Sequence, residues 1–458
     1  MEKILERLNT FKEERYILDL RTNVEKIQSQ RSPSMSSIDD AEFFATRLRT
    51  FLPINKNSFF SDALLQNELK ELVKLKRLRF LSLEGYKNVK ELPKSIGELR
   101  HLRHLDLSFT SIKELPKSLC VLYNLQTLKL VWCEHLTTFP KNLHHLINLR
   151  YVSMSFCNFS VFPPLGQLPA LLTLSIEACD SVETVGLDFY GTSFSKPFPL
   201  LESLTFEKMM IWKEWSTPKE AFPKLKSLAI IGCHRLTGDL PHHLPSLTKL
   251  HIFCCPMLAS LLPLMSNVSE LNINQCKKIS VFKSCGSVQN FDNLEDLHLT
   301  DCHNIEFLPQ FISIQNLEVK QCSFFKLFPL DPFPNAKKIK IESCESLESF
   351  SLPNSQNNLS SLSISFCHNF TFLPDSNFYC PGLTQLRLFR CENLKFLPTK
   401  LPNLFPSLQQ LTIYGCPETA SEEKKELEHL EKTVYVCKMV LAMQYTQPMA
   451  IILPTKQL

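Results

Sequence analysis

Cysteine is the residue type in this chain whose number and spacing could support chemistry. The sequence holds 17 cysteines, and a thiolate can bind a metal ion or enter a disulfide. Twelve of them lie at one position of a repeated pattern: Cys133, Cys157, Cys179, Cys233, Cys255, Cys276, Cys302, Cys322, Cys344, Cys367, Cys391 and Cys416. No CxxC pair occurs, and the charged N-terminus lacks the apolar segment of a signal peptide, so we expect reduced thiols in a cytoplasmic protein. We therefore predict small buried side chains, each a weak donor to the carbonyl group of a neighbouring turn.

The elements that position these cysteines follow the frame LxxLxLxxC, for example from Leu125 to Cys133 and from Leu383 to Cys391. In this frame two apolar residues alternate with polar ones, as in a strand, and the units recur about every 24 residues. The pattern predicts an α/β solenoid, a leucine-rich-repeat horseshoe of about fifteen irregular repeats with a parallel sheet on its concave face. The first inward strand residues are Leu81, Leu105, Leu128, Val152, Leu174, Leu204, Leu228, Leu250, Leu271, Leu297, Leu317, Ile339, Leu362, Leu386 and Leu411.

A second apolar pair follows the cysteine position and often ends in proline, as in Leu92-Pro93 and Leu115-Pro116. Proline fixes φ and has no amide hydrogen for a sheet, so this part of each repeat is expected on an irregular convex side. The 34 phenylalanines are interpreted as core residues between the layers rather than as ligand-binding aromatics.

Several functional classes have no support in the sequence. There is no GxxxxGK[ST], GxGxxG, GxSxG or HExxH motif, and the adjacent pairs His144-His145 and His242-His243 are poor metal ligands because neighbouring side chains point apart. A net charge of +4 is too small to indicate a nucleic-acid partner, and no apolar run is long enough to span a membrane. The sequence predicts a binding protein, with no enzyme activity, cofactor or metal.

Outside the repeats the chain divides into shorter parts. Residues 1–30 contain apolar residues at helical spacing and are expected to form a helix, and the Ser- and Pro-rich residues 31–44 a linker. Residues 45–73 are expected to cap the solenoid, which extends over residues 74–417. Residues 418–458 form a C-terminal tail to which we assign no function.

Three stretches carry a resemblance to a known family. Residues 77–151 include RLRFLSLEGYKNVKELPKSIGELRHLRHLDLSFTSIKELPKSLCVLYNLQTLKL, residues 163–216 include PPLGQLPALLTLSIEACDSVETVGLDFYG and WKEW, and residues 221–250 read AFPKLKSLAIIGCHRLTGDLPHHLPSLTKL. These stretches resemble the repeats of plant intracellular disease resistance proteins of the coiled-coil/NB-ARC/leucine-rich-repeat class. The resemblance implies a role in innate immunity, in which the module binds a pathogen effector, a guarded host protein or a full-length paralogue.

The resemblance also predicts what this chain lacks. RLNTFKEERYILDLR resembles the last helix of the family's coiled coil, whereas AEFFATRLRTFLPI, which follows Asp40, resembles the segment after the NB-ARC module. The family's ADP/ATP site would lie in the missing module, so no cofactor is expected here. Alternatives are an F-box-like ubiquitin-ligase substrate receptor, the non-functional product of a truncated resistance gene, and a cell-surface receptor.

Two sets of outward strand residues are candidate contact surfaces. In the C-terminal repeats the candidate protein-binding residues on the concave face are Lys338, Lys340, Glu342, Gln385, Arg387, Phe389, Gln410, Thr412 and Tyr414, of which Arg387, Phe389 and Tyr414 are of types common in binding hot spots. The resemblance implies that the N-terminal repeats restrain the rest of the receptor. It marks His104, Asp106, Lys129 and Tyr151 as candidates for an intramolecular contact.

Overall fold

The computed structural model describes most of the repeat region. The described residues are 48–52, 66–191, 196–241, 243–259, 267–279, 291–303, 308–323, 325–351, 358–371, 373, 379–394, 401–416 and 434–437. The chain divides into two compact units, Met1–Phe324 and Phe325–Leu458, which are described separately.

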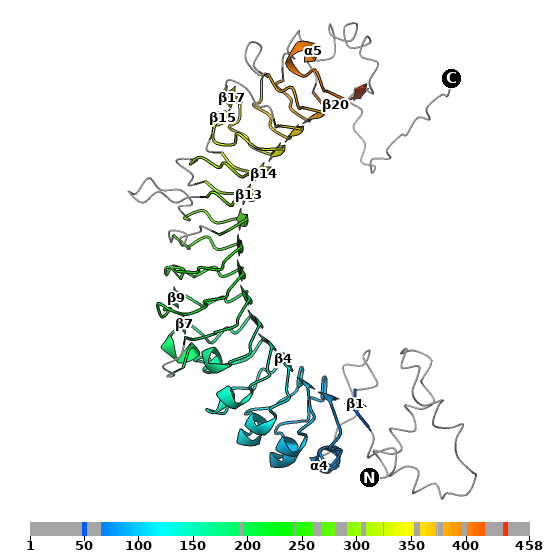
Figure 1. Cartoon of the computed structure of the whole chain (residues 1–458), viewed down its shortest axis with the longest axis vertical. Coiled ribbons are helices and arrows are strands. Elements are labelled where there is room, and N and C mark those ends of the chain that lie inside the picture. The colour runs from blue at the N-terminus through cyan, green and yellow to red at the C-terminus, as the bar shows by residue number, and fades with distance from the viewer. Residues whose placement is uncertain are drawn as a thin grey trace, which may run out of the picture. The chain divides into compact units, whose positions relative to one another are not determined.

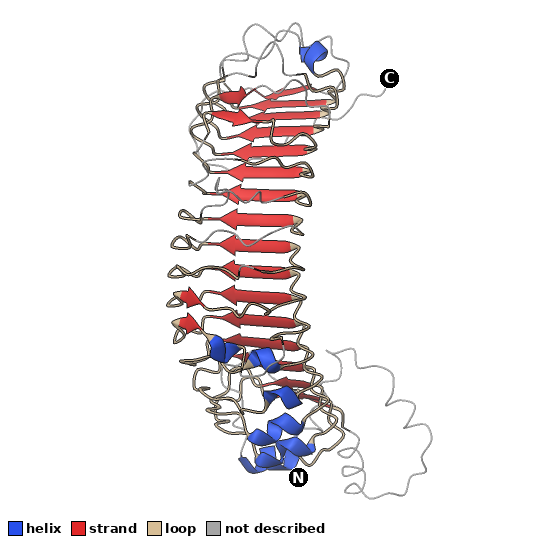
Figure 2. Cartoon of the chain, turned by 60° about the vertical axis from the view of Figure 1, so that its left-hand side comes forward, coloured by secondary structure: helices blue, strands red, loops and turns tan. Residues whose placement is uncertain are grey.

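The first unit is built on a parallel sheet whose strands pair in chain order, one strand per repeat (Figures 1 and 2). Its strands are β1 (Thr50–Phe51), β2 (Phe80–Ser82), β3 (His104–Asp106), β4 (Thr127–Val131), β5 (Tyr151–Ser155), β6 (Thr173–Glu177), β8 (Ser203–Glu207), β10 (Ser227–Ile231), β11 (Lys249–Phe253), β12 (Glu270–Asn274), β13 (Asp296–Thr300) and β14 (Asn316–Lys320). Adjacent strands are in register, so Leu228 lies beside Leu250, and Leu250 beside Leu271. Because strand side chains alternate, the leucines face the core together while the residues between them face outward.

The second unit repeats this construction. Its sheet contains β16 (Lys338–Glu342), β18 (Ser361–Ser365), β19 (Gln385–Phe389), β20 (Gln410–Tyr414) and β21 (Val434–Cys437), again parallel and in chain order. All fifteen leucine-type positions predicted from the repeat lie in strands and are buried, eleven in the first unit and four in the second. The predicted leucine-rich-repeat solenoid with a parallel sheet is confirmed.

The residue just before the cysteine position is in the left-handed region in every one of the fifteen repeats, with φ between 46° and 83°. These residues are Gly85, Phe109, Trp132, Phe156, Ala178, Lys208, Gly232, Cys254, Gln275, Asp301, Gln321, Ser343, Phe366, Arg390 and Gly415. The backbone amide of such a residue donates a hydrogen bond to the next strand, which offsets the cost of the left-handed conformation. For example, Trp132 N donates to Ser155 O at 2.8 Å, and Phe366 N donates to Phe389 O at 2.8 Å. The strained residue therefore turns the chain out of the strand while its amide satisfies the last carbonyl of the next strand.

The cysteines lie directly after this turn, and the prediction that they are buried donors is confirmed. Eight of them place Sγ within 3.2 to 4.0 Å of the carbonyl oxygen of the second inward strand residue in the preceding repeat: Cys133, Cys157, Cys255, Cys276, Cys302, Cys322, Cys391 and Cys416. Each thiol fills a small space in the core and links two successive repeats.

On the opposite side of the repeats from the parallel sheet, the early repeats of the first unit carry 3₁₀ helices: η1 (Lys94–Glu98), η2 (Lys117–Val121), η3 (Leu143–His145), η4 (Leu165–Gln167) and η5 (Leu187–Phe189). Pro93 and Pro116 immediately precede η1 and η2 at φ −63° and −68°, as expected for proline on an irregular side. Short parallel pairs also occur: β7 (Thr184–Val185), which comes just before η5, pairs with β9 (Glu214–Trp215), and in the second unit β15 (Leu327–Pro329) pairs with β17 (Ser349–Ser351).

The interpretation of phenylalanine as core filler holds for the largest buried side chains, which include Phe189, Phe198, Phe206 and Phe222. In the longest repeat step Phe189, Phe198 and Phe222 pack around Tyr190. The Tyr190 hydroxyl accepts a hydrogen bond from Trp215 Nε1 at 2.8 Å. A long insertion is thus accommodated by an aromatic cluster with its polar groups paired.

At the N-terminal end of the first unit, β1 pairs with β2 before the first repeat, and α4 (Gln66–Leu72) follows β1 in the chain, with Leu69 and Leu72 buried. The helix expected over residues 1–30, the linker at residues 31–44 and residues 418–433 of the C-terminal tail lie outside the described residues. In the second unit a short helix, α5 (Leu401–Leu404), precedes β20. Strand β21, in the region treated as a tail without repeats, adds one more parallel strand beside β20.

Candidate protein-binding face

The surface available for binding is the side of each parallel sheet that carries the first, third and fifth strand residues, called here the exposed sheet face. Along β10, for example, Ser227, Ala229 and Ile231 are partly exposed while Leu228 and Ile230 are buried. Because neighbouring strands are in register, residues at the same strand position lie side by side and form a row across the sheet. The chemistry of the face is therefore determined residue by residue by the repeat sequence.

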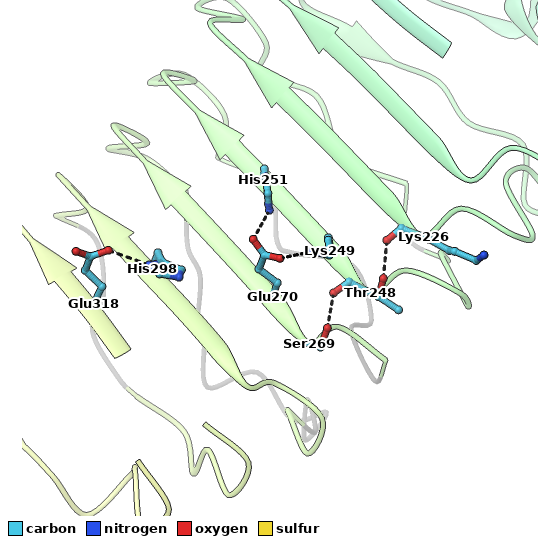
Figure 3. Close-up of polar contacts among 8 residues, drawn as sticks. All are labelled: Lys226, Thr248, Lys249, His251, Ser269, Glu270, His298 and Glu318. Carbon is cyan, nitrogen blue, oxygen red and sulfur yellow. Dashed lines mark hydrogen bonds and ion pairs between the residues drawn. The ribbon is translucent and has the colours of Figure 1, made fainter. Parts of the chain in front are cut away.

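In the middle of the first unit the charges of the exposed sheet face are paired with one another (Figure 3). The carboxylate of Glu270 lies 2.7 Å from Lys249 Nζ and 3.0 Å from His251 Nε2. The hydrogen bond from Lys249 is the main cause that lowers the pKa of Glu270; partial burial opposes this shift, and the charges of Lys249 and His251 add to it. Further along, Glu318 lies 3.0 Å from His298 Nδ1 and 2.9 Å from Lys320 Nζ. This part of the face offers few uncompensated charges to a partner.

The edge where the chain enters the strands is also closed by internal hydrogen bonds. Thr248 Oγ1 donates to Lys226 O at 3.0 Å, and Ser269 Oγ donates to Thr248 O at 3.2 Å, each reaching the preceding repeat (Figure 3). These hydroxyl groups stabilise the solenoid, and their hydrogen-bond donors are already used within the protein.

The four candidates for an intramolecular contact come together on β3, β4 and β5. His104 and Tyr151 share a row through Thr127, and Asp106 lies beside Lys129 in the next row. Partial burial, reinforced by the nearby charges of Arg103 and Lys129, lowers the pKa of His104, so its imidazole is mainly neutral near pH 7. The structure thus gathers these four residues on one face of β3, β4 and β5.

In the second unit the candidate protein-binding residues also occupy matching rows. Lys338, Ser361, Gln385 and Gln410 form the first row, and Lys340, Ser363, Arg387 and Thr412 the third. Glu342, Ser365, Phe389 and Tyr414 form the fifth row. Lys340 Nζ lies 2.9 Å from Glu342, whereas Lys338 and Arg387 are exposed and make no ion pair within the described part of the chain.

The fifth row of the second unit ends in an aromatic cluster. The rings of Phe389 and Tyr414 stack with centroids 4.8 Å apart and an interplanar angle of 10°, and Phe366 meets Phe389 edge-on at 5.2 Å. The Arg390 guanidinium lies over Phe366 at 5.7 Å and over Phe389 at 5.8 Å. Both contacts are within cation–π range. We call Lys338, Lys340, Phe366, Arg387, Phe389, Arg390 and Tyr414 the basic–aromatic patch.

Sequence reasoning missed two members of the patch, Phe366 and Arg390. Both occupy the left-handed position before the cysteine, which lies outside the strand alternation used to choose outward residues. The repeat frame held the signal, because the same position carries Phe109, Trp132 and Phe156 in the first unit. There the Phe109 and Trp132 rings stack at 6.2 Å and those of Trp132 and Phe156 at 4.0 Å.

Within the described residues no group of three or more His, Cys, Asp or Glu side chains could hold a metal ion. Burial raises the pKa of the Cys380 thiol to about 12, so Cys380 carries almost no thiolate near neutral pH. Among the described helices, none combines the length and the apolar character needed to cross a membrane.

The stacked parallel strands, one per repeat with a buried leucine pair and a cysteine turn, define a leucine-rich-repeat protein. A family model described as "Leucine-rich repeat region" matches residues 58–326, more than half of the sequence, and the chain belongs to this family.

The curated relatives are plant disease resistance proteins, and they match over the repeat region. The putative disease resistance RPP13-like protein 1 of Arabidopsis thaliana is 29% identical over 44% of this chain and 21% of its own length. The TMV resistance protein N of Nicotiana glutinosa is 25% identical over 70% of this chain and 28% of its own length. The chain thus spans less than a third of either relative.

Proposed function

We propose that this chain is the recognition module of a plant innate-immunity protein and that it binds another protein through its exposed sheet face. The family match and the resistance-protein relatives support the immune role. The partner would be a pathogen effector, a guarded host protein or a full-length paralogue. In this proposal the chain acts in the cytoplasm, as a binding protein without enzyme activity or a nucleotide switch of its own.

The observation that carries the proposal is the basic–aromatic patch. Arg and Tyr are enriched at the energetic centres of protein interfaces, and here they gather on one side of a rigid sheet. Arg387 is exposed and its charge is not neutralised within the described structure, unlike the paired charges around Glu270. A rigid scaffold that presents such groups loses little side-chain freedom on binding.

The experiment is affinity capture with the full chain from healthy and infected leaf extracts, comparing wild type with the double variant Arg387→Glu/Phe389→Ala. The control is Lys117→Glu, which changes the charge of one basic residue by the same amount at an exposed position of η2, outside both candidate surfaces. We expect a protein that wild type and Lys117→Glu retain and the double variant loses, with its hydrogen-exchange protection on β16 to β20. Identical sets of captured proteins for all three chains would refute binding through the patch.

A separate measurement tests the absence of a nucleotide switch. The purified chain should retain no ATP or ADP after gel filtration and should release no phosphate from ATP. Stoichiometric retention of either nucleotide would contradict this part of the proposal.

A further inference from the structure

We propose that the basic–aromatic patch binds an acidic segment of the partner protein, with an aromatic or apolar side chain of that segment seated on the Phe389–Tyr414 stack. This inference rests on the proposed function and goes further by naming the chemistry of the ligand.

The charge of the patch is the first argument. The outward and left-handed positions of β16, β18, β19 and β20 carry four cationic side chains, Lys338, Lys340, Arg387 and Arg390, against one carboxylate, Glu342. Lys340 lies 2.9 Å from that carboxylate. No other acid is within ion-pair distance of Lys338, Arg387 or Arg390 in the described structure, so the uncompensated charge is positive and complements an acidic partner.

The strand between the cations leaves room for that partner. Strand β18 contributes Ser361, Ser363 and Ser365, and Ser363 shares its row with Lys340 on one side and Arg387 on the other. Two strand spacings separate the backbones of Lys340 and Arg387 by roughly 10 Å. The short side chains of Ser361 and Ser363, both partly exposed, therefore lie between longer cationic ones, and their hydroxyls can donate to a carboxylate.

The aromatic cluster gives the second half of the recognition surface. Phe366, Phe389 and Tyr414 are each partly exposed. The Arg390 side chain lies over the rings of Phe366 and Phe389. Gly415 permits this position, because a Cβ there would come within 2.9 Å of Arg390 Cγ. The guanidinium can thus keep its ring contacts and still present edge donors to a carboxylate.

Single-stranded nucleic acid also binds arginine and aromatic side chains, but the patch fits it less well. Proteins that bind single strands do so in a positively charged groove that follows the backbone over about 4 to 16 nucleotides. Four clustered cations beside a carboxylate match a short acidic peptide better. We therefore make nucleic acid an outcome of the test.

The test is fluorescence anisotropy of the full chain with a short fluorescein-labelled peptide in which Asp and Glu alternate with Phe and Tyr. Matched probes replace the acids by Asn and Gln, replace the aromatics by Ala, or replace the peptide by a single-stranded oligonucleotide. We expect the acidic aromatic peptide to bind, with affinity falling as salt rises, and both altered peptides to bind about tenfold or more weakly.

The variants locate the binding. Arg387→Gln and Arg390→Gln should each weaken binding of the acidic aromatic peptide about tenfold, as removal of a hot-spot arginine does. Arg387→Lys should recover part of it, and the charge-matched Lys117→Gln, at an exposed position of η2 outside both candidate surfaces, should change it less than about twofold. Circular dichroism and denaturation midpoints check that all variants fold.

Equal binding of the amide-substituted peptide, an equal loss with Lys117→Gln, or tighter patch-dependent binding of the oligonucleotide would each overturn the inference. The two proposals fail separately. If leaf proteins are captured through the patch while the acidic probe does not bind, only the ligand chemistry is wrong.

Discussion

The thiol of Cys133 lies 3.2 Å from the carbonyl oxygen of Leu107, a residue 26 positions earlier in the preceding repeat. The contact recurs for eight of the cysteines, so in these repeats the cysteine position joins the repeat to the one before it. In a solenoid, where each repeat touches only its neighbours, such a link contributes directly to the stability of the interface between repeats.

The Cys133→Ala variant should lower the free energy of unfolding by about 1 to 3 kcal/mol, because it leaves a small cavity and removes one of the two donors to the Leu107 carbonyl, the other being Thr110 Oγ1 at 2.7 Å. Guanidinium denaturation followed by circular dichroism measures the change. Cys254→Ala is the control, because it removes a partly exposed thiol that contacts the Gln275 side chain, at 2.7 Å, and it should cost less than about 0.5 kcal/mol. Equal effects would show that the buried contact of the Cys133 thiol with the Leu107 carbonyl contributes no more than an exposed one.

Within residues 66–416, Cys254 should react with thiol reagents before the other cysteines that the structure describes. It is partly exposed, whereas those cysteines are buried, and burial raises the pKa of Cys380 to about 12. Brief iodoacetamide labelling of the native chain followed by peptide mapping should find Cys254 modified and Cys133 and Cys380 largely unmodified. Rapid modification of Cys380 in the folded protein would contradict the buried position.

Gly85 and Gly186 form a matched pair for testing the left-handed turn. An added Cβ would meet no atom within 4 Å at either site, but Gly85 has φ +83° and Gly186 has φ −97°. Gly85→Ala should destabilise the protein by about 1 to 2 kcal/mol, since an L side chain disfavours that region. Gly186→Ala should be neutral or stabilising by up to about 1 kcal/mol. Similar denaturation midpoints for the two variants would remove φ as the cause.

Acid should weaken the contacts around Glu270 in a defined direction. The pKa of Glu270 is lowered in the folded state, chiefly by the hydrogen bond from Lys249. Its stabilising contribution is therefore present above its unfolded pKa of about 4.3 and is lost as pH falls through the lower folded pKa. The stability difference between wild type and Glu270→Gln should be present at pH 7 and vanish in strong acid.

Glu134→Gln is the control for this measurement, because Glu134 is exposed and makes no ion pair in the described structure. Its difference from wild type should stay near zero throughout. A Glu270→Gln difference that persists unchanged into strong acid would contradict the ion pairs with Lys249 and His251.

Trp132 should report on the aromatic stack of the first unit. The chain has 3 tryptophans, and Trp132 is 40% exposed while Trp212 and Trp215 are buried. Acrylamide should therefore quench mainly Trp132, and Phe156→Ala should increase that quenching by removing the ring stacked at 4.0 Å. Quenching unchanged by Trp132→Phe would show that another tryptophan is accessible.

The repeat could be predicted because its signal is local and is written many times. Each leucine pair lies two residues apart, and one slip would turn both to the wrong side, so Leu128 and Leu386 occupy equivalent buried strand positions. The cysteine position was predictable for the same reason. The strand β21 was not, since Val434–Cys437 lacks the leucine frame and is recognised by its pairing with β20.

The basic–aromatic patch was predicted in part. Strand alternation pointed to Arg387, Phe389 and Tyr414. Phe366 and Arg390 join them because they are the left-handed residues directly after β18 and β19, and their side chains contact the ring of Phe389. A left-handed conformation is locally disfavoured for a phenylalanine or an arginine. It is stabilised here by the hydrogen bond that the backbone amide of the residue donates to the next strand.

The sequence by itself determined the class of fold, the inward and outward strand residues and the lack of a nucleotide-binding motif, because these follow from side-chain periodicity and short motifs. Tertiary structure alone decided which outward charges neutralise one another. Glu270 is compensated because stacking places Lys249 and His251 beside it, while Arg387 stays unpaired because stacking places Ser363 and Thr412 beside it. Coulomb attraction depends on distance in space, and that distance exists only once the repeats are packed.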